Sequence, residues 1–114
     1  MNKNDKTFEE RYNESKNIIE KYQNRIPVIV EKCKNCKTIK DIDKTKYLVP
    51  NDMTLTQFIY VIRKRLKITS EQAIFVFINN KIITSTKMIK DIYNEEKDDD
   101  NFLYVNYASE NTFG

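Results

Sequence analysis

Apolar residues recur at helical spacing in three stretches of this chain. Residues 7–22 open with Thr7 and Glu10, a capping box of the form T-x-x-E, and apolar side chains then follow three or four residues apart. Residues 54–66 open with a second capping box and carry the strongest helical pattern of the sequence. A shorter pattern covers residues 88–93. The sequence therefore predicts three helices, the first of them an N-terminal arm.

Strand patterns separate these helices. Pro27 restricts the first strand to a sheet edge or to its own beginning, and Pro50 ends the second. The third is an uninterrupted apolar run, which predicts a central strand buried on both faces, and Asn79-Asn80 forms the turn after it. Four strands are expected, at residues 26–32, 46–49, 73–78 and 102–107.

The order of these elements is a helical arm followed by β-β-α-β-α-β. This order predicts an α+β chain of the ubiquitin-like β-grasp class, with a four-stranded mixed sheet, two main helices and the additional N-terminal helical arm. A length of 114 residues suits one domain. We expect the arm at residues 1–24, the β-grasp core at residues 25–107 and a flexible tail at residues 108–114.

The composition is that of a soluble globular protein, with 39% hydrophobic and 32% charged residues. No apolar run approaches membrane-spanning length, and the first ten residues are too polar for a secretory signal. Any membrane attachment is therefore expected to be added after synthesis.

Several kinds of chemistry are disfavoured. The chain has no histidine, which excludes Ser-His and Cys-His pairs and histidine metal sites. Cys33 and Cys36 form one CxxC in a lysine-rich stretch, so reduced thiols in a loop are favoured over a redox pair or half of a zinc site. The run Asp98-Asp99-Asp100 lacks the ligand spacing of a calcium loop. We expect no enzyme activity, no metal and no cofactor.

The net charge of +3 is unevenly spread, because residues 1–46 carry twelve basic and eight acidic side chains. A basic face suits an acidic partner or anionic lipid headgroups, although a merely solvated face remains an alternative. No nucleic-acid motif accompanies the charge, so nucleic acid is not an expected partner.

The sole glycine is Gly114, the last residue. Its carboxylate has no Cβ beside it and its backbone is unrestricted, as an acyl donor threaded into a narrow enzyme site requires. The alternative is that the chain simply stops there.

Five segments carry a resemblance to a known family: NRIPVIVEK at 24–32, DKTKYLVP at 43–50, FIYVIRKR at 58–65, FLYVNY at 102–107 and ENTFG at 110–114. They closely resemble the autophagy-related protein 8 family, which includes GABARAP and microtubule-associated protein light chain 3. The similarity runs from about Thr7 to Gly114. It implies a ubiquitin-like modifier that acts in autophagosome formation.

The resemblance assigns Gly114 a role. In that family an activating enzyme adenylates the terminal carboxylate, a conjugating enzyme transfers it to the amine of phosphatidylethanolamine, and a cysteine protease trims the precursor and later removes the lipid. It implies a cytoplasmic protein that moves to autophagosome or other vesicle membranes once lipidated. Contacts to the processing enzymes would come from Phe75, Phe77 and Phe113.

The resemblance also implies capture of cargo receptors that carry an aromatic-x-x-aliphatic motif, added as a strand beside the second strand of the sheet. The aromatic pocket would be lined by Glu14, Ile18, Pro27, Ile29, Lys46, Leu48 and Phe102. The aliphatic pocket would be lined by Tyr47, Val49, Pro50, Met53, Phe58, Val61 and Ile62, although ordinary core is an equal alternative for Phe58 and Ile62. Acidic residues flanking the motif would meet Arg25, Lys44, Lys46 and Arg65.

Three departures from the family pattern stand out. The Cys33–Lys40 loop differs in sequence and by one residue in length, Met53 replaces the usual Leu, and Asn101 replaces a glycine after the acidic run. Both pockets are unaffected by the loop. A functional alternative also remains, a trafficking or cytoskeletal linker that is never lipidated and binds tubulin through its basic N-terminal helices.

Overall fold

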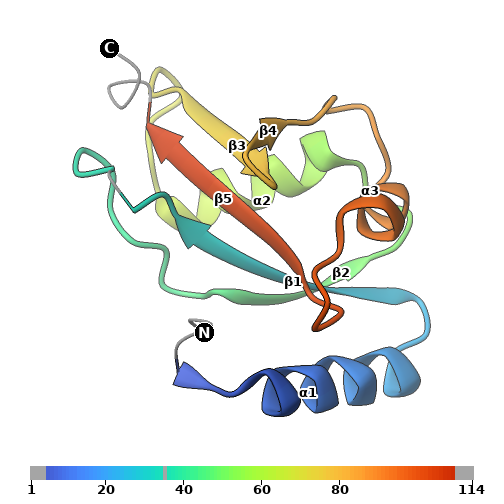
Figure 1. The fold of residues 1–114 in the computed structure, drawn as a ribbon. Coiled ribbons are helices and arrows are strands. Elements are labelled where there is room, and N and C mark those ends of the chain that lie inside the picture. Colours follow the sequence, from blue (N-terminus) through green and yellow to red (C-terminus); the bar gives the residue numbers. More distant parts are fainter. Residues whose placement is uncertain (1–4, 35, 110–114) are drawn as a thin grey trace.

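The computed structural model describes residues 5–34 and 36–109 (Figure 1). Within them the chain forms one mixed sheet with helices packed against it. The helices are α1 (Phe8–Lys21), α2 (Leu55–Leu66) and α3 (Ile89–Glu96). The strands are β1 (Arg25–Lys32), β2 (Lys46–Pro50), β3 (Ile74–Ile78), β4 (Lys81–Ile82) and β5 (Leu103–Ser109).

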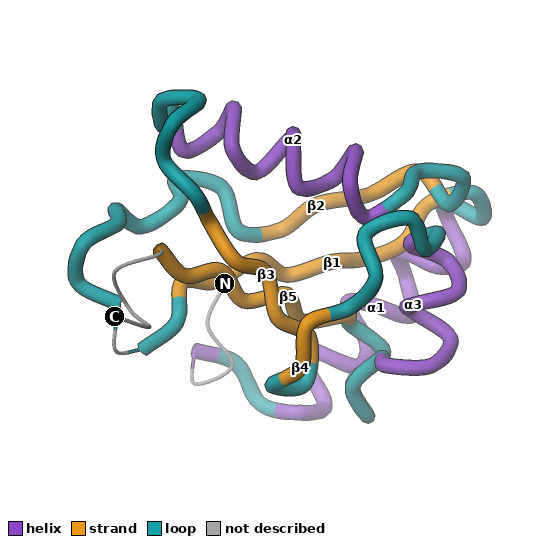
Figure 2. Tube along the Cα trace, turned by 90° about the horizontal axis from the view of Figure 1, so that it is seen from above, coloured by secondary structure: helices purple, strands orange, loops and turns teal. Residues whose placement is uncertain are grey.

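The strands lie in the order β2-β1-β5-β3-β4. β1 pairs with β5 in parallel, and the other neighbours are antiparallel. Figure 2 shows α2 running along the sheet it packs against. The predicted α+β order is confirmed, and β1 and β5 meet because the helices carry the chain back across the sheet between them.

Three details of the strand prediction are wrong. The sheet has five described strands and not four, because Lys81 and Ile82 pair back onto β3 after the turn at Asn79-Asn80. The central strand is β5 and not the apolar run, which lies between β5 and β4. β5 also continues through Ala108 and Ser109, both buried, so the expected tail begins later than residue 108.

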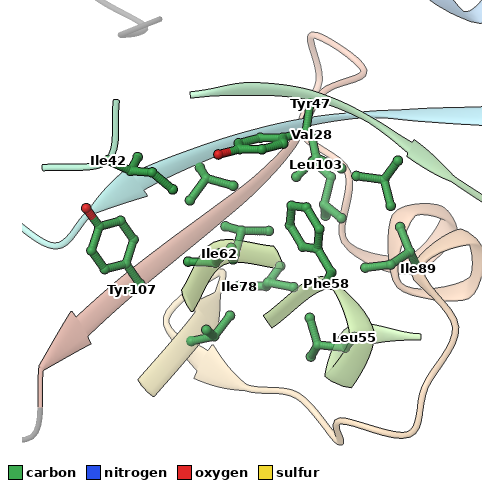
Figure 3. Close-up of a cluster of buried hydrophobic side chains, with 14 of the residues drawn as sticks. Val28, Ile42, Tyr47, Leu55, Phe58, Ile62, Ile78, Ile89, Leu103 and Tyr107 are labelled. Carbon is green, nitrogen blue, oxygen red and sulfur yellow. The ribbon is translucent and has the colours of Figure 1, made fainter. Parts of the chain in front are cut away.

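The main core lies between α2 and one face of the sheet (Figure 3). α2 buries its predicted apolar face, with Leu55, Phe58, Ile62 and Leu66 each at most 1% exposed. Each such side chain contributes roughly 1.5–3 kcal/mol of hydrophobic stabilisation. Thr54 caps the helix, since its hydroxyl accepts from the N–H of Gln57, whose side chain accepts from Thr54 N–H at 2.9 Å.

The polar connection at residues 33–45 adds to this core. Cys36, Ile39 and Ile42 are buried, which the lysine-rich sequence did not suggest. Cys36 Sγ accepts from the N–H of Ser109 at 3.3 Å, and Tyr107 donates its hydroxyl to the Lys40 carbonyl at 2.8 Å. The connection therefore packs against the end of β5, and neither of its cysteines forms a disulfide with a described residue.

The N-terminal helix α1 lies outside the main core, as none of its residues belongs to the main buried cluster. It begins with the predicted capping box of Thr7 and Glu10 and packs against β1 on the far side of the sheet. None of the helices within residues 5–34 and 36–109 is both long and apolar enough to cross a membrane.

Candidate functional site

β2 lies at an edge of the sheet and has β1 as its single strand neighbour among the described residues. The N–H of Val30 donates to Thr45 O at 2.7 Å, and main-chain groups alternate in direction along an antiparallel pair. The N–H and C=O groups of Lys46 and Leu48 therefore face away from β1. The guanidinium of Arg25 donates one bond to Leu48 O at 3.3 Å, which marks that carbonyl as accessible from the edge.

Side chains of β2 divide between the two faces of the sheet. Tyr47 and Val49 are 7% and 3% exposed and belong to the core beside α2, where the Tyr47 ring meets Phe58 edge-on at 5.5 Å. Lys46 and Leu48 point to the α1 side and are half-buried. This alternation places the two predicted pockets on opposite faces of one edge strand.

The α1 side brings the predicted aromatic-pocket residues together. Pro27, Ile29 and Phe102 are buried but do not belong to the main core cluster, and α1 packs against β1 above them. Glu14 and Ile18 are one helical turn apart on α1 and both half-buried. The result is an apolar floor with one wall formed by α1.

Electrostatics at this wall centre on Glu14. Its carboxylate pairs with Lys6 at 2.7 Å and, through its other oxygen, with Lys46. Burial, with Lys6 nearby, lowers the pKa of the Lys46 ammonium. Lys46 thus connects β2 to α1 across the predicted pocket.

On the α2 side an open surface hollow lies beside the end of β2. Three predicted aliphatic-pocket residues line it, Pro50, Met53 and Val61. The other four are core residues beneath it, so their assignment to the pocket remains a prediction: Tyr47, Val49, Phe58 and Ile62. The hollow is completed by residues the sequence analysis did not single out, which are Asp52, Thr56, Gln57 and Tyr60.

Tyr60 is the most informative of the missed residues. Its ring is 61% exposed, and the Lys64 ammonium lies 5.2 Å above it. Gln57, Tyr60 and Val61 follow helical spacing on α2, so the sequence could also have predicted that they share the outward-facing side of this helix. The sequence prediction considered only the buried side.

The remaining predicted basic residues lie near the opposite end of β2. Arg65 pairs with Asp43 at 2.8 Å, and the ammonium of Lys44 lies 5.0 Å from the centre of the Tyr47 ring. Arg25 and Lys46 add two further basic groups along β2, of which Lys46 is paired with Glu14. Acidic residues of a ligand would find such partners at either end.

The predicted enzyme contacts lie elsewhere. Phe75 and Phe77 are half-buried on β3, which β1 and β5 separate from β2. Phe113 and Gly114 fall outside the described residues. A second, polar hollow on the α1 side of the sheet contains none of the predicted site residues, and its floor includes Glu31, Tyr104 and Asn106.

Within residues 5–34 and 36–109, no group of three or more cysteine, aspartate or glutamate side chains is placed to hold an ion. Burial raises the pKa of the Cys33 thiol, so this side chain is a weak nucleophile near neutral pH. The features of this region that suit ligand binding are the edge of β2 and the hollow beside its end.

Comparison with known proteins agrees with this architecture. The family model described as "Autophagy protein Atg8 ubiquitin like" matches residues 10–114. Autophagy-related protein 8e of Arabidopsis thaliana is 50% identical over 112 residues, which is 98% of this chain and 91% of that protein. Autophagy-related protein 8 of Vanderwaltozyma polyspora is 52% identical over 112 residues, covering 98% and 94%. The crystal structure of Trypanosoma brucei ATG8 superposes with a TM-score of 0.87 at 40% identity, covering 92% of this chain and 90% of that one.

Proposed function

The chain belongs to the Atg8 family of ubiquitin-like autophagy proteins, and from this premise we propose that it is a modifier joined through Gly114 to phosphatidylethanolamine. On the autophagosome membrane it acts as an adaptor for cargo receptors. The observation that carries the proposal is that the family match extends through Gly114, while β2 has β1 as its single strand neighbour among the described residues. One feature supplies attachment and the other supplies recognition.

The chemistry of attachment is supplied by other proteins. An activating enzyme converts the Gly114 carboxylate into an adenylate and then a thioester, and a conjugating enzyme passes the acyl group to the lipid amine. This chain contributes the acyl group and the surfaces those enzymes hold. Five residues follow Ser109, and five residues reach at most roughly 17 Å. That reach supports a carboxylate that enters an enzyme site while the domain stays outside it.

Recognition follows from strand geometry. An extended peptide placed along β2 would pair with the main-chain groups of Lys46 and Leu48 and displace the guanidinium of Arg25 from Leu48 O. Residues three apart in a strand point to opposite faces. An aromatic-x-x-aliphatic motif thus sends its aromatic residue toward α1 and its aliphatic residue toward the hollow at Met53 and Val61.

The expected affinity is moderate. An aromatic side chain buries roughly 150–250 Å², a gross gain of about 4–6 kcal/mol at about 25 cal/mol/Å². Ordering and association costs offset much of this. A Kd near 1 μM, about −8 kcal/mol, is the expected range, and many copies on one membrane would raise the avidity.

Peptide titration tests the groove. Leu48→Ala should weaken binding of an acidic aromatic-x-x-aliphatic peptide by about 1 kcal/mol or more in calorimetry, because Leu48 lies on the edge strand between the pockets. Ile82→Ala is the matched control, since Ile82 is 67% exposed on β4 at the opposite edge. Equal affinities for Leu48→Ala and wild type would remove the groove assignment.

Membrane fractionation of starved cells tests the conjugation. Wild type should become membrane-bound until detergent is added, and Gly114→Ala should stay in the soluble fraction. Mass spectrometry of the membrane-bound protein should find a phosphatidylethanolamine adduct on Gly114. A Gly114→Ala protein that still fractionates with membranes would overturn the proposal and favour a linker that is never lipidated.

A further inference from the structure

The side chain of Asp100 is an ionisable group that the proposed binding scheme leaves unused. It lies in the loop before β5, which descends toward α1 (Figure 1), and it is 0% exposed. A buried carboxylate is strongly destabilising unless donors surround it. Its contacts therefore show what this residue holds in place.

Three donors meet the carboxylate. Arg11 Nε and the Tyr104 hydroxyl both donate to Oδ2, at 2.9 and 2.5 Å. The N–H of Phe102 donates to Oδ1 at 2.9 Å. In addition, the Ser15 hydroxyl donates to the main-chain carbonyl of Asp100 at 2.5 Å.

These donors come from both the wall and the floor of the predicted aromatic pocket. Arg11 lies within one helical turn of Glu14, and Ser15 lies within one turn of both Glu14 and Ile18, whereas Phe102 is a floor residue from the loop before β5. The Phe102 ring also packs edge-on against Tyr104 at 6.4 Å. One residue thus joins the helix wall to the aromatic floor.

α1 is held in this position by its packing against β1 and by the polar contacts that it makes with the β-grasp. No α1 residue belongs to the main core cluster, so the packing that fixes α2 does not fix α1. These polar contacts include the pair between Glu14 and Lys46 and the two contacts that Arg11 and Ser15 make with Asp100. Removing one partner of a buried ion pair leaves the other charge uncompensated, so the contact to Arg11 matters more than a surface pair would.

We infer that Asp100 is a positioning residue that holds α1 against Phe102 and thereby sets the selectivity of the pocket for an aromatic side chain. The inference rests on the proposed groove and deepens it. The two halves of the peptide-binding site then differ in their dependence on Asp100. The α1 half depends on Asp100, whereas the hollow at Met53 and Val61 is built on α2 and the core and does not.

The test uses the full chain and three peptides: an acidic peptide with Trp-x-x-Leu, the same peptide with Trp replaced by Ala, and the same with Leu replaced by Ala. Asp100→Asn keeps the shape of the side chain and removes its charge. The Trp-to-Ala discrimination should fall at least fivefold, and the Leu-to-Ala discrimination should stay within twofold of wild type. Glu95→Gln is the matched control, because it also replaces a carboxylate by an amide but removes only an exposed pair with Lys87.

Two milder variants protect the test from a folding failure. Ser15→Ala removes the helix contact to the Asp100 carbonyl, and Tyr104→Phe removes one donor to its carboxylate. Each should lower the Trp-to-Ala discrimination at least twofold. Amide hydrogen exchange should quicken in α1 and remain unchanged in α2, which a general loss of stability would not produce.

The outcomes separate the two proposals. If wild type binds and discriminates while all three variants discriminate equally well, the role of Asp100 is wrong and the groove stands. If both discriminations fall together and α2 exchange rises, Asp100 serves general stability and the inference fails. If wild type does not bind the Trp-x-x-Leu peptide, the groove itself is wrong and the inference falls with it.

Discussion

Replacing Tyr47 by Phe should stabilise the protein. The Tyr47 hydroxyl is buried and has no hydrogen-bond partner among the described residues. A buried polar group without a partner costs about 1–3 kcal/mol. Phe keeps the edge-on contact with Phe58 and the approach of the Lys44 ammonium to the ring, so little packing is lost. We expect the free energy of unfolding to rise by about 1 kcal/mol, with Tm higher by about 4 °C.

Tyr107→Phe provides a control of opposite sign. Tyr107 is 0% exposed, and its hydroxyl donates to the Lys40 carbonyl at 2.8 Å. Its removal leaves that carbonyl without its donor and should cost about 1–2 kcal/mol. Urea unfolding followed by circular dichroism measures both variants against wild type.

The Tyr47→Phe variant also tests whether the Tyr47 hydroxyl takes part in peptide binding. Because the Tyr47 ring points into the core, Tyr47→Phe should leave affinity for an aromatic-x-x-aliphatic peptide within twofold of wild type. A Tyr47→Phe protein that is 1 kcal/mol less stable than wild type would refute the reasoning about the unpaired hydroxyl. A large loss of affinity at unchanged stability would show instead that this hydroxyl belongs to the binding surface.

Two further predictions concern a helix cap and alkaline pH. Thr54→Ala should lower the free energy of unfolding by about 1 kcal/mol through loss of the capping box with Gln57, and Thr7→Ala should move the urea midpoint less because α1 lies outside the core. An equal shift in both would contradict that difference. Burial raises the pKa of Tyr107 to about 12, so above pH 10 the unfolded chain loses a proton that the folded chain keeps, and the contribution of Tyr107 to stability should fall by about 1.4 kcal/mol per pH unit up to about pH 12. Urea unfolding at pH 8 and pH 11 checks this, and a Tyr107→Phe protein with an undiminished pH dependence would count against it.

The helices were predictable because their signals are local. The capping box at Thr54 and the apolar face of residues 55–66 reproduce α2 as found. The position of each strand within the sheet could not be predicted from local sequence. The apolar run at residues 73–78 was expected at the centre, yet the centre is β5, because pairing depends on partners tens of residues away in sequence. The buried apolar residues of the connection at residues 33–45 were not predicted, because they are interspersed with lysines.

The candidate site was also predictable only in part, because some of its features are local in sequence and others depend on how the elements pack. Alternation along β2 was visible in the sequence, but which of Tyr47 and Leu48 faced the core depended on the side to which α2 packs. The resemblance supplied the pocket residues, and α2 supplied the unpredicted Tyr60. Asp100 carried no signal beyond an acidic run, since its importance comes from donors that the fold brings to it from residues 11, 15 and 104.

The two halves of the site differ in how they are stabilised. The half at Met53 and Val61 is built on α2, whose buried face is part of the main core, so it persists as long as the domain is folded. The half beneath α1 lies outside that core and depends on the docking of α1, to which the polar contacts at Glu14 and Asp100 contribute. Local opening proceeds most easily where few apolar contacts are lost. The aliphatic end of a peptide therefore meets a surface fixed by the fold, whereas the aromatic end meets one that depends on α1 remaining docked. Selection among partners by their aromatic residue then becomes a property of α1 docking as much as of the pocket floor.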